Sequence, residues 1–124
     1  SPESFAGSEI LYHVGFHDKT NTNRGFVQVW NLPYPLKTFL DNSKAVSQQN
    51  YKCFVSGETN INGIPGYFWD YTVQGGGGMS YKGSEVFLQK GGRMYRISYF
   101  VPENKWNKEQ QDIFRHMVNS FKVY

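Results

Sequence analysis

Residues 66–101 read GYFWDYTVQGGGGMSYKGSEVFLQKGGRMYRISYFV, and apolar and polar side chains alternate along both ends of this stretch. In its first part the alternate positions are Tyr67, Trp69, Tyr71 and Val73, and in its last part they are Tyr95, Ile97, Tyr99 and Val101. A period of two with this aromatic content is typical of β-strands. The glycine runs at 75–78 and 91–92 allow the tight reversals between strands. The stretch therefore predicts a meander of three antiparallel strands.

The residues upstream of this meander predict three more strands and a helix. Residues 9–17 and 25–32 alternate in the same way around the turn-forming cluster DKTNTNRG, which predicts a hairpin. Pro35 suits the first turn of a helix, and Leu36, Phe39, Leu40 and Val46 follow at near-helical spacing through about Gln49.

A further strand is predicted at 51–58, and the Asn62-Gly63 pair is a strong hairpin signal between Ile61 and Ile64. Pro65 lacks an amide N–H, so we expect an edge or a bulge directly after that turn.

The C-terminal region predicts a second helix, which begins after a break at 102–105. Asn107, followed by Gln110 three residues later, has the spacing of an N-terminal cap. One apolar stripe follows and contains Ile113, Phe114, Met117, Val118 and Phe121. We expect this helix to cover one face of the sheet, with Phe121 as an anchor.

The composition indicates one domain over residues 1–124. The chain has 39% hydrophobic and 18% aromatic residues, enough for a single core without disulfides or metals. Its net charge of +3 is spread along the sequence, which argues against a nucleic-acid partner. No apolar run is long enough to span a membrane. The chain opens on Ser1-Pro2, so we expect a trimmed N-terminus, with a lipid anchor upstream as one possibility.

The order of the elements indicates an α+β domain with an antiparallel sheet packed between helices. Three stretches carry a resemblance to the PsbP family: INGIPGYFWDYTVQ at 61–74, RMYRISYFVP at 93–102 and NSFKVY at 119–124. The element order matches from about residue 9 to residue 124. The resemblance implies a PsbP-like fold. It also implies an extracytoplasmic setting, because similar bacterial domains are often secreted lipoproteins, whereas the plant members are lumenal subunits of photosystem II. The long N-terminal segment of the plant members has no counterpart here, so we do not expect a photosynthetic role.

No catalytic or metal-binding motif stands out in the sequence. On a strand, His13 and His17 would be separated by about 13 Å, too far apart to chelate one ion together. His116 is expected on the surface of the second helix, and Cys53 is expected to be a small buried side chain on the same face as Tyr51 and Val55. The glycines at 75–78 are followed by no phosphate-binding Lys-Ser/Thr pair. We therefore predict no catalytic residue, no metal and no cofactor.

The aromatic residues are the remaining candidates for a binding surface. Trp30, Tyr67, Trp69 and Tyr81 could form an exposed platform that grips a protein or stacks on a sugar ring. The sequence favours a non-enzymatic, extracytoplasmic binding module with a protein partner at the cell envelope. Two alternatives stay open: a small hydrolase or isomerase with a cleft near the 75–78 loop, and a carbohydrate-binding module.

Overall fold

The computed structural model describes residues 8–20, 22–47 and 51–123, which form one antiparallel sheet and two helices. The elements in chain order are β1 (Glu9–His17), β2 (Arg24–Asn31), α1 (Leu36–Ser47), β3 (Tyr51–Ile61), β4 (Ile64–Gln74), η2 (Gly76–Gly78), β5 (Ser80–Lys90), β6 (Arg93–Pro102), η3 (Glu103–Lys105) and α2 (Lys108–Asn119). The two η elements are single turns of 3₁₀ helix. The predicted order of strands and helices is confirmed.

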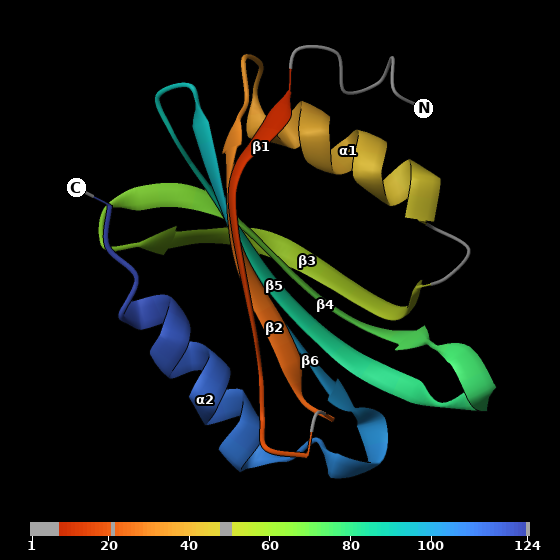
Figure 1. The fold of residues 1–124 in the computed structure, drawn as a ribbon. Coiled ribbons are helices and arrows are strands. Elements are labelled where there is room, and N and C mark those ends of the chain that lie inside the picture. The colour runs from red at the N-terminus through yellow and green to blue at the C-terminus, as the bar shows by residue number, and fades with distance from the viewer. Residues whose placement is uncertain (1–7, 21, 48–50, 124) are drawn as a thin grey trace.

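The six strands lie in the order β1-β2-β6-β5-β4-β3, and every neighbouring pair is antiparallel. Four of the five pairings are hairpins between strands that follow one another in the chain. The fifth pairing joins β2 to β6 and closes the N-terminal hairpin onto the C-terminal strand of the meander. β1 and β3 are left as the two edges of the sheet (Figure 1).

Turn chemistry explains the β3–β4 hairpin. Asn62 and Gly63 have φ angles of 53° and 88°, as a two-residue primed turn requires. The side chain of Asn60 accepts a hydrogen bond from the Gly63 amide at 2.9 Å. Pro65 pairs with Asn60 on β3, and the ladder between β4 and β5 begins only at Gly66. The expectation of an edge or a bulge directly after the turn is therefore wrong: β4 lies between β3 and β5, and its pairing with β3 is regular at Pro65.

One face of the sheet packs against α1. Leu36, Phe39 and Leu40 of α1 meet a buried cluster on this face that contains Leu32, Trp69, Tyr71, Phe87 and Met94. The start of α1 is held by Gln89 of β5, whose side-chain oxygen accepts a hydrogen bond from the Leu36 amide at 2.8 Å. Pro35 directly precedes the helix. The side chain of the predicted stripe residue Val46 and the predicted helix end at 48–49 lie outside the described residues.

The opposite face packs against α2 (Figure 1). The buried members of this second cluster are Ile64, Val86, Leu88, Ile97 and Val118, and Phe114, Met117 and Phe121 pack around them. Asn107 caps α2 as predicted, with its side chain accepting from the Gln110 amide at 3.1 Å. The side chain of Gln110 does not return to the cap. It accepts hydrogen bonds from the Tyr99 hydroxyl and the Asn23 amide group, which ties α2 to β6 and to the β1–β2 turn.

Two details of the predicted apolar stripe on this helix are wrong. Ile113 is 40% exposed, because it lies on the outer side of α2. The helix ends at Asn119, so Phe121 packs from the following segment, with its ring 5.6 Å from that of Tyr95. The sheet does lie between two helices, but each helix covers only part of its face.

The prediction of a buried Cys53 is also wrong. Cys53 is exposed and has a φ angle of 52°. The pairing of β3 with β4 shifts in register between Lys52 and Val55, which identifies a bulge in this edge strand. The bulge breaks the alternation on which the prediction of a shared face with Tyr51 and Val55 depended.

A buried ion pair lies in the α1-facing layer of the sheet. Glu85 is 0% exposed, and its carboxylate contacts the Arg96 guanidinium at 2.7 Å. The hydroxyls of Tyr71 and Ser98 donate to the same carboxylate. Burial and then the charge of Glu85 raise the pKa of Tyr71 above its usual value of 10.0, so its hydroxyl remains a donor at physiological pH. The carboxylate is therefore fully satisfied without water.

The core on the α2 side can be tested with a matched pair of aliphatic residues. Leu88→Ala should lower the free energy of unfolding by about 2 to 5 kcal/mol, because Leu88 is completely buried. Ile113→Ala should change it by no more than about 0.5 kcal/mol, as an exposed site does. Chemical denaturation measures both, and equal losses would contradict the assigned orientation of α2.

The buried ion pair can be tested on one strand. Arg96→Met should lower the free energy of unfolding by about 3 to 5 kcal/mol, because it leaves the Glu85 carboxylate buried without a cation. Arg93→Met, at an exposed position of the same strand, is the control and should cost no more than about 0.5 kcal/mol. A loss below 1 kcal/mol for Arg96→Met would show that water reaches Glu85.

Candidate functional site

The four aromatic residues predicted to form a platform do not lie together on an exposed surface. Trp69 is buried, with 4% of its surface exposed, and its ring packs 4.9 Å from Phe87. Trp30 and Tyr67 are half-buried and pack against the cluster under α1. Tyr81 lies at the start of β5, half-buried, with its ring against Gly75.

The prediction of an exposed platform is therefore wrong for Trp69. Its position on β4 faces α1, and the same alternation that suggested a strand places Trp69 in the core. Trp30 also has a structural role, because its ring meets Phe39 edge-on at 5.1 Å and its N–H donates to Gln28. A candidate site is found on the opposite face of the sheet.

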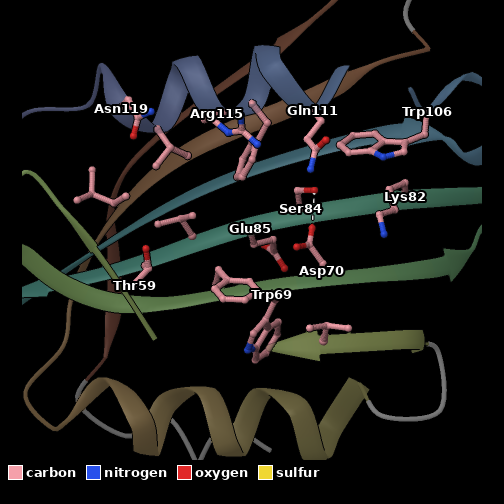
Figure 2. Close-up of a pocket in the computed structure, with 16 residues that line it drawn as sticks. Thr59, Trp69, Asp70, Lys82, Ser84, Glu85, Trp106, Gln111, Arg115 and Asn119 are labelled. Atoms are coloured by element: carbon pink, nitrogen blue, oxygen red, sulfur yellow. Dashed lines mark hydrogen bonds between the residues drawn. The ribbon is translucent and has the colours of Figure 1, made fainter. Parts of the chain in front are cut away.

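A groove runs between α2 and strands β3 to β5, with a cavity volume of about 460 Å³ (Figure 2). It exists because α2 packs toward the β6 side of the sheet, where Phe114 stacks on Tyr99 at 6.4 Å. Ile64, Val86 and Leu88 are still buried on this face, but part of the α2-facing surface of β3, β4 and β5 is left without a helix above it. The polar residues that line the groove are Thr59, Asp70, Lys82, Ser84, Glu85, Gln111, Arg115 and Asn119, and the carboxylate of Glu85 is bound by Arg96.

The floor and one end of the groove are apolar or aromatic. Val55, Ile61 and Val86 come from the strands, and Phe114 and Val118 come from α2. Trp106 lies half-buried at the end of the groove, in the short segment between η3 and α2. Its position is fixed by a hydrogen bond from its backbone amide to the Glu103 carbonyl at 3.2 Å. Figure 2 shows its indole near Gln111 and Lys82.

The charges in the groove have few partners. Asp70 accepts a hydrogen bond from the Ser84 hydroxyl at 2.9 Å. Arg115 contacts Asp112 of the same helix at 3.7 Å, a long and partly exposed pair. Lys82 is half-buried and makes no ion pair with any residue that the structure describes. Lys82 and Arg115 are therefore available to a ligand.

The groove does not contain the histidine pairing of a serine or cysteine hydrolase. Neither histidine nor cysteine is among its lining residues, and the Ser84 hydroxyl donates its hydrogen bond to the Asp70 carboxylate. His13 bonds to Gln28 and His17 to the Asp18 carbonyl, both on β1, and His116 lies on the outer side of α2. Gly75–Gly78 do not line the groove. The apolar floor and the polar rim of the groove can together bind a molecule that has both apolar and polar groups.

No metal site emerges from the described part of the chain. Within 8–20, 22–47 and 51–123, no three His, Cys, Asp or Glu residues gather closely enough to hold an ion. In the same ranges, neither helix has the length and apolar character needed to cross a bilayer.

The groove could not be recognised from aromatic residues on strands, because most of its polar lining residues are not aromatic. A signal was nevertheless present: Gln111, Arg115 and Asn119 follow one another at intervals of four, which gives a polar line along one side of α2. Asp70, Lys82 and Ser84 occupy the α2-facing positions of neighbouring strands, because Asp70 pairs with Ser84. Only the pairing register brings the two sets together.

Comparisons with known proteins agree with this architecture. No curated protein matches the sequence. Among solved structures, a protein of unknown function from Pseudomonas aeruginosa matches with a TM-score of 0.69 and 10% identity, over 100% of this chain and 89% of that one. The solution structure of cyanobacterial PsbP (CyanoP) from Synechocystis sp. PCC 6803 matches with a TM-score of 0.63 and 16% identity, with the same coverage. The family model of PsbP matches residues 13–123, and the chain therefore belongs to the PsbP family.

Proposed function

We propose that this domain is a non-enzymatic, extracytoplasmic binding module that holds a protein partner at the cell envelope in the groove beside α2. The observation that carries the proposal is the composition of the groove. Apolar side chains form its floor, Trp106 lies at one end, and Lys82 and Arg115 offer cations without strong partners.

This composition suits a protein segment. Tryptophan and arginine are the residue types that most often dominate binding energy at protein interfaces. The amide groups of Gln111 and Asn119 and the hydroxyl of Thr59 can bond to the main chain of a partner. An apolar side chain of the partner would lie on Val55 and Ile61. The groove thus offers a place for a side chain and for the backbone that carries it.

The non-enzymatic part of the proposal rests on the lack of a histidine or cysteine among the lining residues and on the partners of Ser84. The Ser84 hydroxyl donates to the Asp70 carboxylate, and among the described residues no hydrogen bond from a third side chain orients this pair, as a catalytic triad requires. The hydrolase or isomerase alternative needed a cleft near Gly75–Gly78, and this groove lies elsewhere on the sheet.

The extracytoplasmic setting is supported by the likeness to secreted bacterial domains of the PsbP type. A lipid anchor upstream would hold the groove close to a membrane surface and to partners there. The extracytoplasmic setting and the lipid anchor are both parts of the proposal.

A carbohydrate ligand is the second candidate, and Trp106 favours it. A half-buried indole beside Gln111, Lys82 and Asp70 can stack on a sugar ring while the polar groups bond to hydroxyls. Photo-crosslinking distinguishes the two candidates. A protein partner gives an adduct with the added mass of a second protein, whereas a small sugar gives no adduct of that size.

Site-specific photo-crosslinking tests the proposed function. A photoreactive residue at Gln111, inside the groove, should yield a discrete protein adduct in cells that make the domain. The same residue at His116, on the outer side of α2, should yield none. Adducts at both positions, or at neither, would contradict the proposal, and binding of soluble glycans in the second case would favour the carbohydrate alternative.

The captured partner then allows the energetics to be measured. Trp106→Ala should weaken its binding by about 2 kcal/mol or more, roughly thirtyfold in Kd, as expected for a hot spot. Ile113→Ala is the control and should leave Kd unchanged, because Ile113 faces away from the groove. Isothermal calorimetry on both variants checks this, after thermal unfolding has shown that each is folded.

A further inference from the structure

The largest group of exposed apolar side chains lies on one strand. Seven large hydrophobic residues are exposed in the described part of the chain, and four of them belong to β1: Ile10, Leu11, Tyr12 and Val14. Tyr12 is the most exposed, at 58%. Contiguous exposed apolar residues mark sites of association more often than isolated ones do. The groove beside α2 does not include any of the four.

β1 is also an edge of the sheet, and its edge is not protected in the way that the other edge is. β3 carries Lys52 and Glu58 and a bulge at Cys53, devices that discourage pairing with another strand. β1 has a bulge only between Ile10 and Tyr12, and from Tyr12 to His17 it pairs regularly with β2. Its acidic residue, Glu9, lies at the end of the strand.

The backbone groups that β1 turns outward can be assigned from its turn. The Asp18 amide donates to the Asn23 carbonyl at 3.0 Å, so these two residues form a hydrogen-bonded pair. Such pairs alternate along an antiparallel ladder. The main-chain groups of Phe16 and Val14 therefore point toward β2, and those of His13, Gly15 and His17 point away from the sheet. Within the described residues no strand lies there to receive them.

We propose that β1 pairs antiparallel with β1 of a second copy of this chain, about a two-fold axis at His13. His13 of each copy then exchanges both main-chain hydrogen bonds with His13 of the other, and the Gly15 amide donates to the Leu11 carbonyl. The sheets of the two copies join into one, and the proposal does not depend on what the groove binds.

A second copy is favoured over a foreign strand because the sequence EILYHVGFH complements itself in this register. Tyr12 comes opposite Val14 of the other copy, an aromatic residue against a β-branched one, and this contact occurs twice. Glu9 comes near His17 of the other copy, so the ends of the two strands carry complementary groups. The symmetric interface is isologous, which is the usual form of a homodimer.

The pairing also covers apolar surface on both faces of the sheet. Ile10 pairs with Trp30 and so shares its α1-facing side, whereas Val14 pairs with Val27 and so shares its α2-facing side. These side chains stay exposed in the described structure, and a strand paired at this edge would shield both sides at once.

Gly15 offers a variant that removes pairing and leaves the monomer intact. A side-chain carbon added at Gly15 would lie 3.8 Å from its nearest neighbours, the Gly25 carbonyl and the His13 ring, which is ordinary contact. Proline is tolerated on an edge strand where the lost amide faces outward. Gly15→Pro therefore removes the outward donor, and thermal unfolding of the variant shows whether the monomer accepts the proline ring. Gly15→Ala keeps that donor and is the matched control.

Sedimentation velocity of the purified chain over a wide concentration range tests the proposal. The chain should shift from its monomer mass of 14.3 kDa to twice that value as concentration rises. Gly15→Pro should weaken this association at least tenfold, because one hydrogen bond is lost in each copy, and Gly15→Ala should leave it unchanged. Tyr12→Ala should also weaken it. Circular dichroism and thermal unfolding confirm that each variant is folded.

Two outcomes would overturn the proposal. A chain that stays monomeric at every concentration would show that β1 does not pair with itself. A dimer that survives Gly15→Pro with the affinity of Gly15→Ala would show that the copies meet through another surface.

Discussion

A six-stranded sheet has two faces to bury, and this chain provides one helix of twelve residues for each. Six strands spaced about 4.8 Å apart span roughly 24 Å, whereas a helix with its side chains is only about 10 to 12 Å across. Each helix therefore covers about half of its face. The part of the sheet that neither helix covers includes the groove beside β3 to β5 and the exposed strand β1. Both features therefore follow from the difference in width between the sheet and the helices.

The two faces of the sheet differ in how their polar side chains are paired. On the α1 side, the layer contains a buried carboxylate and a largely buried guanidinium that satisfy each other, with Tyr71 and Ser98 completing the set. This network specifies which strands lie side by side, since Glu85, Arg96 and Ser98 meet only in the observed register. On the α2 side, Lys82 and Arg115 have no partner of that quality. The polar groups around Glu85 bind one another and stabilise the fold, whereas Lys82 and Arg115 can bind a ligand.

Local sequence signals predicted most of the fold, because most of its pairings are local. The alternation of Tyr95, Ile97 and Tyr99, the Asn62-Gly63 turn and the Asn107 cap each depend on residues close in the chain. The pairing of β2 with β6 could not be predicted in this way, since about seventy residues separate the two strands.

The site was harder to predict for a physical reason. Alternation shows that Trp69 belongs to a face, but it does not show which face a helix will cover, and Trp69 proved to lie under α1. The same limit applies to Cys53, because a bulge shifts the phase of the alternation without a signature of its own in the sequence. Lys82 and Arg115 become one site only after β5 and α2 are placed side by side.

The pairing of β2 with β6 has a consequence for how the chain folds. Strands β3 to β6 form from short loops, so their assembly costs little closure entropy, whereas the β1–β2 hairpin must join across the long separation between β2 and β6. The hairpin is therefore expected to dock late in folding and to detach early in unfolding. Until it docks, β6 is itself an open edge, and its residues Tyr95 and Ile97 lack their partners on β2. During synthesis the β1–β2 hairpin leaves the ribosome before the other strands of the sheet, and β6, with which it pairs, leaves after them.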